Sequence, residues 1–121
     1  MIVKNFEQEI STLTEFWSPR VVGQINDQYV KVAKVKGELA WHKHDHEDEM
    51  FFIVKGSLVI QYENSAVTLK AGDFHVVPKN TMHNPVAEEE CWIALVEPVE
   101  TKHTGDIVTD KTKSISEQLS S

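Results

Sequence analysis

The sequence has only one cysteine, Cys91, in 121 residues. A single cysteine cannot form a disulfide within the chain, and it is compatible with a reducing cytoplasm. The residues that follow it, 92–95, are apolar and predict a buried strand, and nothing nearby would lower the pKa of the thiol. We therefore expect Cys91 to be a packed side chain and not a nucleophile.

Long apolar runs are also missing. No run approaches the roughly 18 residues that a membrane-spanning helix needs, and residues 1–16 contain no apolar block of signal-peptide length. These absences argue against a membrane protein and against a secreted one. We expect a cytoplasmic protein.

Positive charge is scarce. Lys and Arg number 12 against 19 Asp and Glu, so the formal net charge is −7. Such a chain is repelled by nucleic acid and by anionic membrane surfaces, and we expect neither as a partner. Hydrophobic residues make up 40% of the chain, enough for the core of one domain, so we predict a single domain over residues 1–121.

Only residues 5–16 have a helical pattern. Apolar residues recur there at spacings of four, three and four, which places on one helical face Phe6, Ile10, Leu13 and Trp17. Asn5 can cap the start, with Gln8 in the capping-box position, and Pro19 prevents continuation. The sequence predicts one N-terminal helix.

From residue 28 onward the apolar period changes from 3.6 to 2. Seven or eight short alternating segments follow, separated by turn signals and with no helix between them, which predicts an antiparallel sandwich or barrel over about residues 28–98. Residues 56–73 read as a hairpin with Asn64 and Ser65 near its tip. The last segment, 99–121, is polar, and its end from about residue 106 is either a frayed tail or a short helix against a partner.

Three of the six histidines lie in the stretch WHKHDHEDEMFFIVKG, residues 41–56. If residues 38–46 form a strand, one face carries His42, His44 and His46, and the other carries Leu39, Trp41 and Lys43. Glu49 begins an apolar strand, where a carboxylate is costly to bury unless it is paired or bound to a metal.

A further histidine, His83, ends the stretch GDFHVVPKNTMH after a proline and a tight turn. If its strand lies beside the first stretch, His83 can enter the same cavity. Imidazole and carboxylate ligands together suit a divalent transition metal: zinc, manganese, iron, cobalt or nickel. The alternative is a set of solvated or hydrogen-bonded histidines without a metal.

These two stretches resemble the two motifs of the cupin superfamily. The first motif is matched by Gly37, His42-Lys43-His44, Glu49 and Gly56, and the second by Gly72, Pro78 and His83. Asn80 stands where the second motif has a turn glycine, and Ala87 stands where it ends in Asn. The resemblance covers about residues 28–98 and is closest to the small cupins called mannose-6-phosphate isomerase-like, a label that describes similarity and not that reaction.

The resemblance implies an all-β fold, the double-stranded β-helix or jelly roll. It also implies one divalent metal bound by His42, His44, Glu49 and His83. His46 is then a residue at the rim of the site. Small cupins commonly pair through their outer sheets, so we expect a homodimer that covers Trp41, Met50 and Phe52.

Such a site leaves one or two coordination positions open to water or a ligand. We expect a small polar ligand or substrate, sugar-like or carbonyl, with the metal acting as a Lewis acid in isomerase-like or epimerase-like chemistry. The alternatives are an iron-dependent dioxygenase and a non-catalytic binding module. The sequence shows no acid–base pair beyond the ligands, although Tyr62, His75 or His46 could serve, and His103 reads as a polar loop residue.

Overall fold

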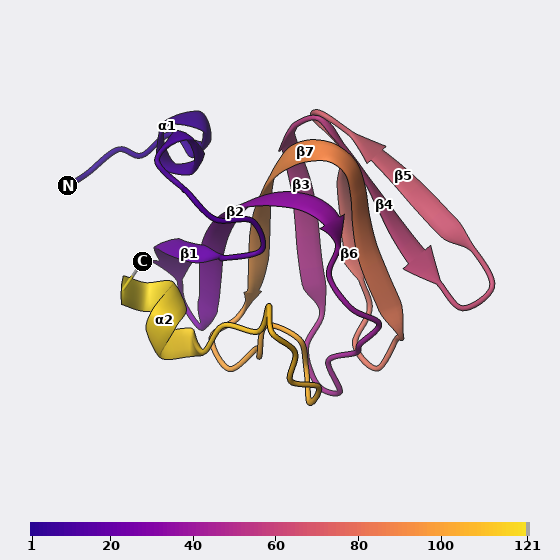
Figure 1. Cartoon of the computed structure of the whole chain (residues 1–121). Helices are drawn as coiled ribbons and strands as arrows, with labels where there is room; N and C mark the ends of the chain where they lie inside the picture. Colours follow the sequence, from indigo (N-terminus) through magenta and orange to yellow (C-terminus); the bar gives the residue numbers. More distant parts are fainter. Residues whose placement is uncertain (121) are drawn as a thin grey trace.

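The structure is a computed structural model that describes residues 1–120. Most of the chain is β-sheet, with a short helix near each end (Figure 1). In chain order the elements are α1 Phe6–Ser11, β1 Arg20–Ile25, β2 Gln28–Glu38, β3 Glu49–Lys55, β4 Ser57–Tyr62, β5 Ala66–Lys70, β6 Phe74–Val77, β7 His83–Pro98 and α2 Ile115–Ser120. In residues 1–120 no helix has the length and apolar character required to cross a membrane.

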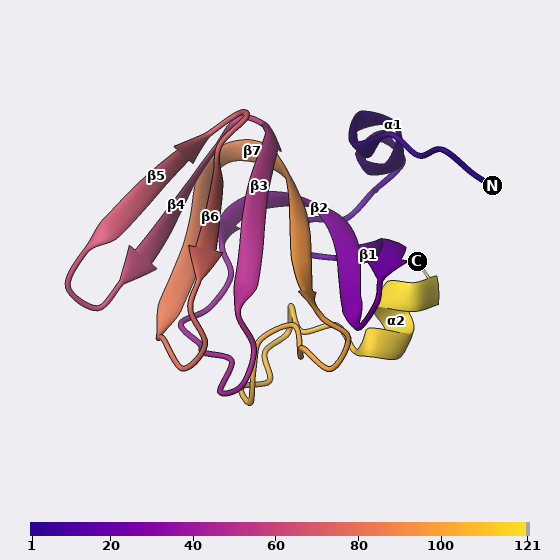
Figure 2. The same cartoon turned by 180° about the vertical axis from the view of Figure 1, so that it is seen from behind.

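The long strand β7 connects the two parts of the jelly roll. It pairs antiparallel with β2 and β3, and its first residues also pair with β4, whose other neighbour is β5. The main sheet has the order β1-β2-β7-β3-β6. The β4–β5 hairpin projects on the side of the molecule that lies away from β1, as the views from both sides show (Figures 1 and 2). This confirms the predicted all-β jelly roll and the hairpin around Asn64 and Ser65.

Period-2 alternation on β2 separates two apolar clusters. Ala33 and Val35 face the interior, where they meet side chains of β3, β4 and β7. Val32 faces outward and packs with Ile10 and Leu13 of the N-terminal segment. Cys91 is fully buried in the interior cluster, and burial raises the pKa of its thiol to about 11, so it is protonated at neutral pH.

The N-terminal helix is shorter than the sequence predicted. Asn5 caps it as expected, because its side chain accepts a hydrogen bond from the Gln8 backbone N–H at 3.1 Å. However, α1 ends at Ser11, where the Ser11 and Thr12 hydroxyls donate back to carbonyl groups of the last turn. Such bonds compete with helix continuation. Trp17 is buried all the same, with left-handed backbone at φ 58° and its indole N–H donating to the Lys36 carbonyl.

The N-terminal helix covers part of the outer face that the sequence predicted to be exposed. Phe52 packs against Phe6, with ring centroids 6.2 Å apart, and lies beside the cluster of Ile10 and Leu13. Phe52 and Met50 are therefore partly covered within the chain, whereas Trp41 is 40% exposed. The exposed apolar surface on this face is therefore smaller than the sequence predicted.

The polar C-terminal segment has a defined path. After β7 it runs along the same end of the jelly roll as the connection between β2 and β3, and it finishes in α2, which packs against β1 (Figures 1 and 2). Of the two predictions for this end, a short helix forms over residues 115–120, and it packs against this chain rather than against a partner. Residue 121 lies outside the described residues.

Candidate metal centre

His42 and His44 lie in the connection between β2 and β3, residues 39–48. The predicted strand over 38–46 is not formed, because β2 ends at Glu38 and only an isolated bridge follows, between His42 and His83. Alternation nevertheless holds across residues 41–44, with both histidines buried and Trp41 and Lys43 exposed. It fails at residue 39: Leu39, expected on the outer face, packs in the interior cluster.

A turn before β7 places His83 beside this connection. Backbone hydrogen bonds join His42 and His83 in both directions, at 3.0 and 2.9 Å. Asn80 adopts left-handed backbone at φ 58°, which Asn tolerates where the motif has glycine, and its N–H donates to the His44 carbonyl. The two stretches that carry the motifs are thus bonded directly to each other.

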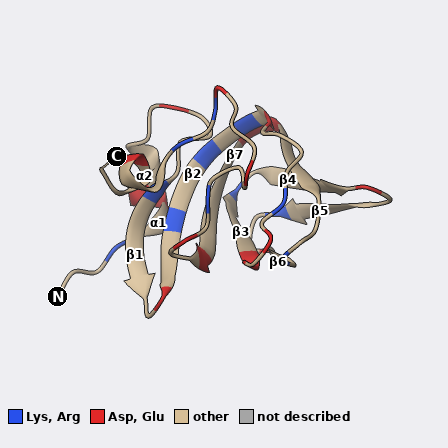
Figure 3. Ribbon diagram, turned by 90° about the horizontal axis from the view of Figure 1, so that it is seen from below, with Lys and Arg blue, Asp and Glu red and all other residues tan. Residues whose placement is uncertain are grey.

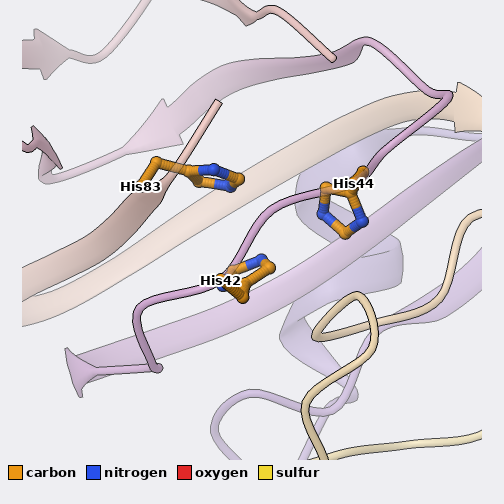
Figure 4. Close-up of side chains that lie close together, drawn as sticks. All are labelled: His42, His44 and His83. Atoms are coloured by element: carbon orange, nitrogen blue, oxygen red, sulfur yellow. The ribbon is translucent and has the colours of Figure 1, made fainter. Parts of the chain in front are cut away.

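Three imidazole rings meet in this place, and Figure 4 shows them facing one another. One nitrogen from each of His42, His44 and His83 lies within 4.8 Å of the others, and all three side chains are buried. His46 is not part of the group: its side chain is exposed, and it lines a polar pocket together with His44.

Glu49, the first residue of β3, completes the cluster. Its Oε1 lies 3.6 Å from His44 Nε2 and 3.7 Å from His83 Nε2, and the side chain is buried. The structure therefore brings together all four residues that the sequence predicted as ligands.

Hydrogen bonds to backbone carbonyl groups fix two of the rings. His42 Nδ1 lies 2.8 Å from the Ala40 carbonyl oxygen, and His83 Nδ1 lies 2.8 Å from that of Thr81. A carbonyl oxygen only accepts, so each Nδ1 carries the proton and each neutral ring keeps a free lone pair on Nε2. This is the arrangement by which a protein orients a metal-binding histidine.

Several buried polar atoms at the site lack a hydrogen-bond partner within the protein. They are His83 Nε2, both ring nitrogens of His44, and Glu49 Oε1. Buried polar groups are rarely left unpaired, and a missing ion is one explanation. Three nitrogen donors and one carboxylate oxygen fit a divalent transition metal in number and type.

The neutral state of the His42 ring also favours metal binding. Burial and the neighbouring His83 lower the pKa of His42 to about 4, so its ring is neutral at pH 7. For His44, burial alone would lower the pKa, but the carboxylate of Glu49, whose Oε1 lies 3.6 Å from His44 Nε2, outweighs it and the pKa is raised from its usual 6.5. His44 is therefore the ring at which protons compete with a metal.

We expect metal affinity to fall as the pH is lowered from 8 to 6. A metal must displace the proton from His44, so below the pKa of that ring the affinity should drop about tenfold per pH unit. Competition of Zn²⁺ between the protein and a fluorescent chelator measures this. An affinity that stays constant from pH 8 to pH 6 would contradict it.

Two charged residues at the site were missed by the sequence interpretation. Lys31 Nζ lies 2.7 Å from Glu97 Oε1, with both side chains buried, and the Glu97 carboxyl interacts with that of Glu49. Burial and the charge of Glu49 raise the pKa of Glu97 well above its usual value, whereas the pKa of Glu49 is held low. Of these two carboxyl groups, Glu49 is therefore the one that ionises more readily. Strand parity was the available signal, since Lys31 lies two residues before the inward-facing Ala33 on β2 and therefore shares its face.

Two hollows adjoin the cluster. An apolar cavity of about 20 Å³, room for about one water molecule, is lined by His42, Glu49 and His103 among mostly apolar side chains. On the other side of His44, a polar pocket of about 260 Å³ lies between the 43–47 stretch and residues 100–106. His103 is therefore more than a polar loop residue. Of the other suggested acid–base residues, Tyr62 and His75 pair with each other, with Tyr62 Oη 2.7 Å from His75 Nε2.

Comparison with known proteins points the same way. Residues 29–96 match the cupin domain family. A solved cupin-2 domain protein from Shewanella frigidimarina is 43% identical, with a TM-score of 0.78 over 79% of this chain and 94% of that one. The uncharacterized protein YdbB of Bacillus subtilis is 36% identical over 51% of this chain, and the pectin degradation protein KdgF of Dickeya dadantii is 39% identical over 40% of it. The matches span about half the length of these two relatives, 56% and 44%.

Proposed function

The chain belongs to the cupin domain family, and we propose that it binds one divalent transition metal through His42, His44, Glu49 and His83 and uses it to bind or transform a small polar molecule. The observation that carries this is a buried cluster of three imidazoles and a carboxylate in which His44, His83 and Glu49 have polar atoms without a hydrogen-bond partner. When bound, the metal would supply Lewis-acid polarisation of a carbonyl or hydroxyl oxygen.

The surrounding residues support a small polar ligand. Most of the residues that line the pocket beside His44 are charged, among them Lys43 and Lys102 with acids around them. Such a lining offers both donors and acceptors to hydroxyl, carbonyl or carboxylate groups. Glu97, His44 and His83 hold the pKa of Glu49 low in spite of its burial, so a carboxylate stands at the edge of the cluster.

Loading with Co²⁺ tests the open coordination position. We expect one Co²⁺ per chain, and a visible absorption spectrum that changes when a small oxygen ligand, acetohydroxamate, is added. A bound metal whose spectrum does not respond would indicate a closed, structural site and favour the non-catalytic module.

The natural metal separates the chemical alternatives. Zinc, manganese or nickel in the purified protein directs assays to isomerase-like and epimerase-like reactions of sugar-like or carbonyl compounds. Iron directs them to oxygen consumption, the dioxygenase alternative. The mannose-6-phosphate isomerase-like label remains a description of sequence similarity.

We also propose a cytoplasmic homodimer. The edge strand β6 exposes the side chains of Phe74, at 66%, and Val76. Trp41, which precedes the proposed ligand His42 in the sequence, is 40% exposed. An edge strand with apolar side chains is a natural surface for a second copy. Light scattering on the eluting protein should give the mass of two chains, and the mass of one chain would contradict this part.

A further inference from the structure

Residues 99–114, here called the C-terminal strap, are fixed in place on the protein. Thr101 and Thr104 are fully buried, and the Thr104 hydroxyl donates to the Ile107 carbonyl and lies 2.7 Å from the Thr112 hydroxyl. Lys111 Nζ donates to the Glu38 carbonyl at the end of β2. A polar segment with this many internal bonds and buried threonines is built to hold one shape.

The strap lies directly against the connection that carries the histidines. Gly105 has φ +61°, and a Cβ at this position would lie 2.1 Å from the Lys43 carbonyl oxygen. Only glycine allows so close an approach together with this backbone conformation. The strap therefore lies next to the connection that carries His42 and His44. His103, two residues before Gly105, lines the cavity. Figure 3 views the molecule from the end at which these loops lie.

One hydrogen bond defines the state of the His103 ring. The backbone N–H of Lys113 donates to His103 Nδ1 at 2.9 Å, so Nδ1 accepts and the neutral ring carries its proton on Nε2. Burial, the largest effect, lowers the pKa of His103 to about 4, so this neutral form holds at pH 7. Within residues 1–120, no protein group accepts the Nε2 proton.

His103 therefore carries an N–H donor for which no acceptor is found in residues 1–120, and the residue lines the cavity that His42 and Glu49 also line. That cavity has room for about one water-sized oxygen atom. The other lining residues are mostly apolar, such as Trp17, Val35 and Phe51, and supply no competing donor there besides the ligand cluster.

We propose that His103 is a ligand-binding residue, whose Nε2–H donates a hydrogen bond to an oxygen atom of a small carbonyl, hydroxamate or carboxylate compound held at the metal centre. This inference rests on the proposed function and names the group that recognises the ligand. A neutral donor fixed in this way stabilises negative charge on that oxygen without an ionic pair of its own.

The test uses the Co²⁺-loaded protein and acetohydroxamate as the probe. His103→Leu removes the donor with little change in size, and His103→Gln keeps an N–H at about the reach of Nε2. We expect His103→Leu to weaken the probe about tenfold, His103→Gln to stay within about threefold of the wild type, and both variants to bind one Co²⁺ per chain. Wild-type probe affinity in His103→Leu, or equal weakening in both variants, would overturn the inference.

A second measurement needs no variant. Long-range ¹H–¹⁵N NMR of the ring should show the proton of His103 on Nε2, and the Nε2 resonance should shift when acetohydroxamate binds the Co²⁺- or Zn²⁺-loaded protein. A proton on Nδ1, or a resonance that the probe leaves unchanged, would count against the inference.

The two proposals fail in different ways. A wild-type protein that binds no Co²⁺ overturns the proposed function, and this inference falls with it. Bound Co²⁺ that takes up the probe with no contribution from His103 overturns the inference alone.

Discussion

A variant with both His44→Ala and His83→Ala is expected to contain less than about a tenth of a metal ion per chain, against about one in the wild type. Both rings offer unpartnered nitrogens to the cluster, and only His42 and Glu49 would remain as ligands. Two ligands do not hold a divalent transition metal against buffer and water. Elemental analysis of the tag-free proteins by mass spectrometry measures this.

The matched control is a variant that loses the same number of histidines elsewhere. His46 is exposed and His75 pairs with Tyr62, so His46→Ala with His75→Ala should keep the metal content of the wild type. Metal retained by the first variant, or lost from the control, would mean that the ligands are other residues than those proposed.

Lys31→Met is expected to lower the free energy of unfolding of the chelator-treated protein by about 3–5 kcal/mol. The substitution leaves two carboxyl groups, Glu97 and Glu49, buried in contact without the ammonium group that lies 2.7 Å from Glu97. Removal of one member of a buried ion pair costs far more than the pair itself contributes, because the remaining group cannot reach water. Urea denaturation followed by tryptophan fluorescence measures the change.

Two further variants separate burial from charge. The Lys102–Asp106 pair is largely exposed, and Lys102→Met should cost less than about 1 kcal/mol. Lys31→Met combined with Glu97→Leu should be more stable than Lys31→Met alone, because the uncompensated carboxyl is gone. If Lys31→Met and Lys102→Met cost the same, the buried pair has no special role in the fold.

Strand alternation carried most of the fold prediction. On β2 the odd-numbered Ala33 and Val35 point inward and Val32 points outward, as a period of two requires. β2 begins at residue 28 and β7 ends at residue 98, but the sheet also includes β1, Arg20–Ile25, which the predicted range 28–98 leaves out. Helix length could not be read in the same way, because the hydroxyls of Ser11 and Thr12 bond to their own backbone and end α1 early.

The four proposed ligands were predictable because they sit in local motifs, whereas their neighbours at the site were not. Glu97 meets Lys31 only through the pairing of β2 with β7, in which Tyr29 lies opposite Glu97. His103 reaches the cavity only through the path of the strap, fixed by the contact of Gly105 with Lys43. Both depend on long-range contacts that no spacing along the chain reveals.

The most direct test of the metal site is anomalous diffraction from crystals of the metal-loaded protein, recorded at the absorption edge of the bound metal. We predict one strong peak per chain at bonding distance, about 2.0–2.2 Å, from His42 Nε2, His83 Nε2, a ring nitrogen of His44 and the Glu49 carboxylate. No peak in this cluster, or a peak held instead by the exposed acids of residues 45–48, would contradict the central claim.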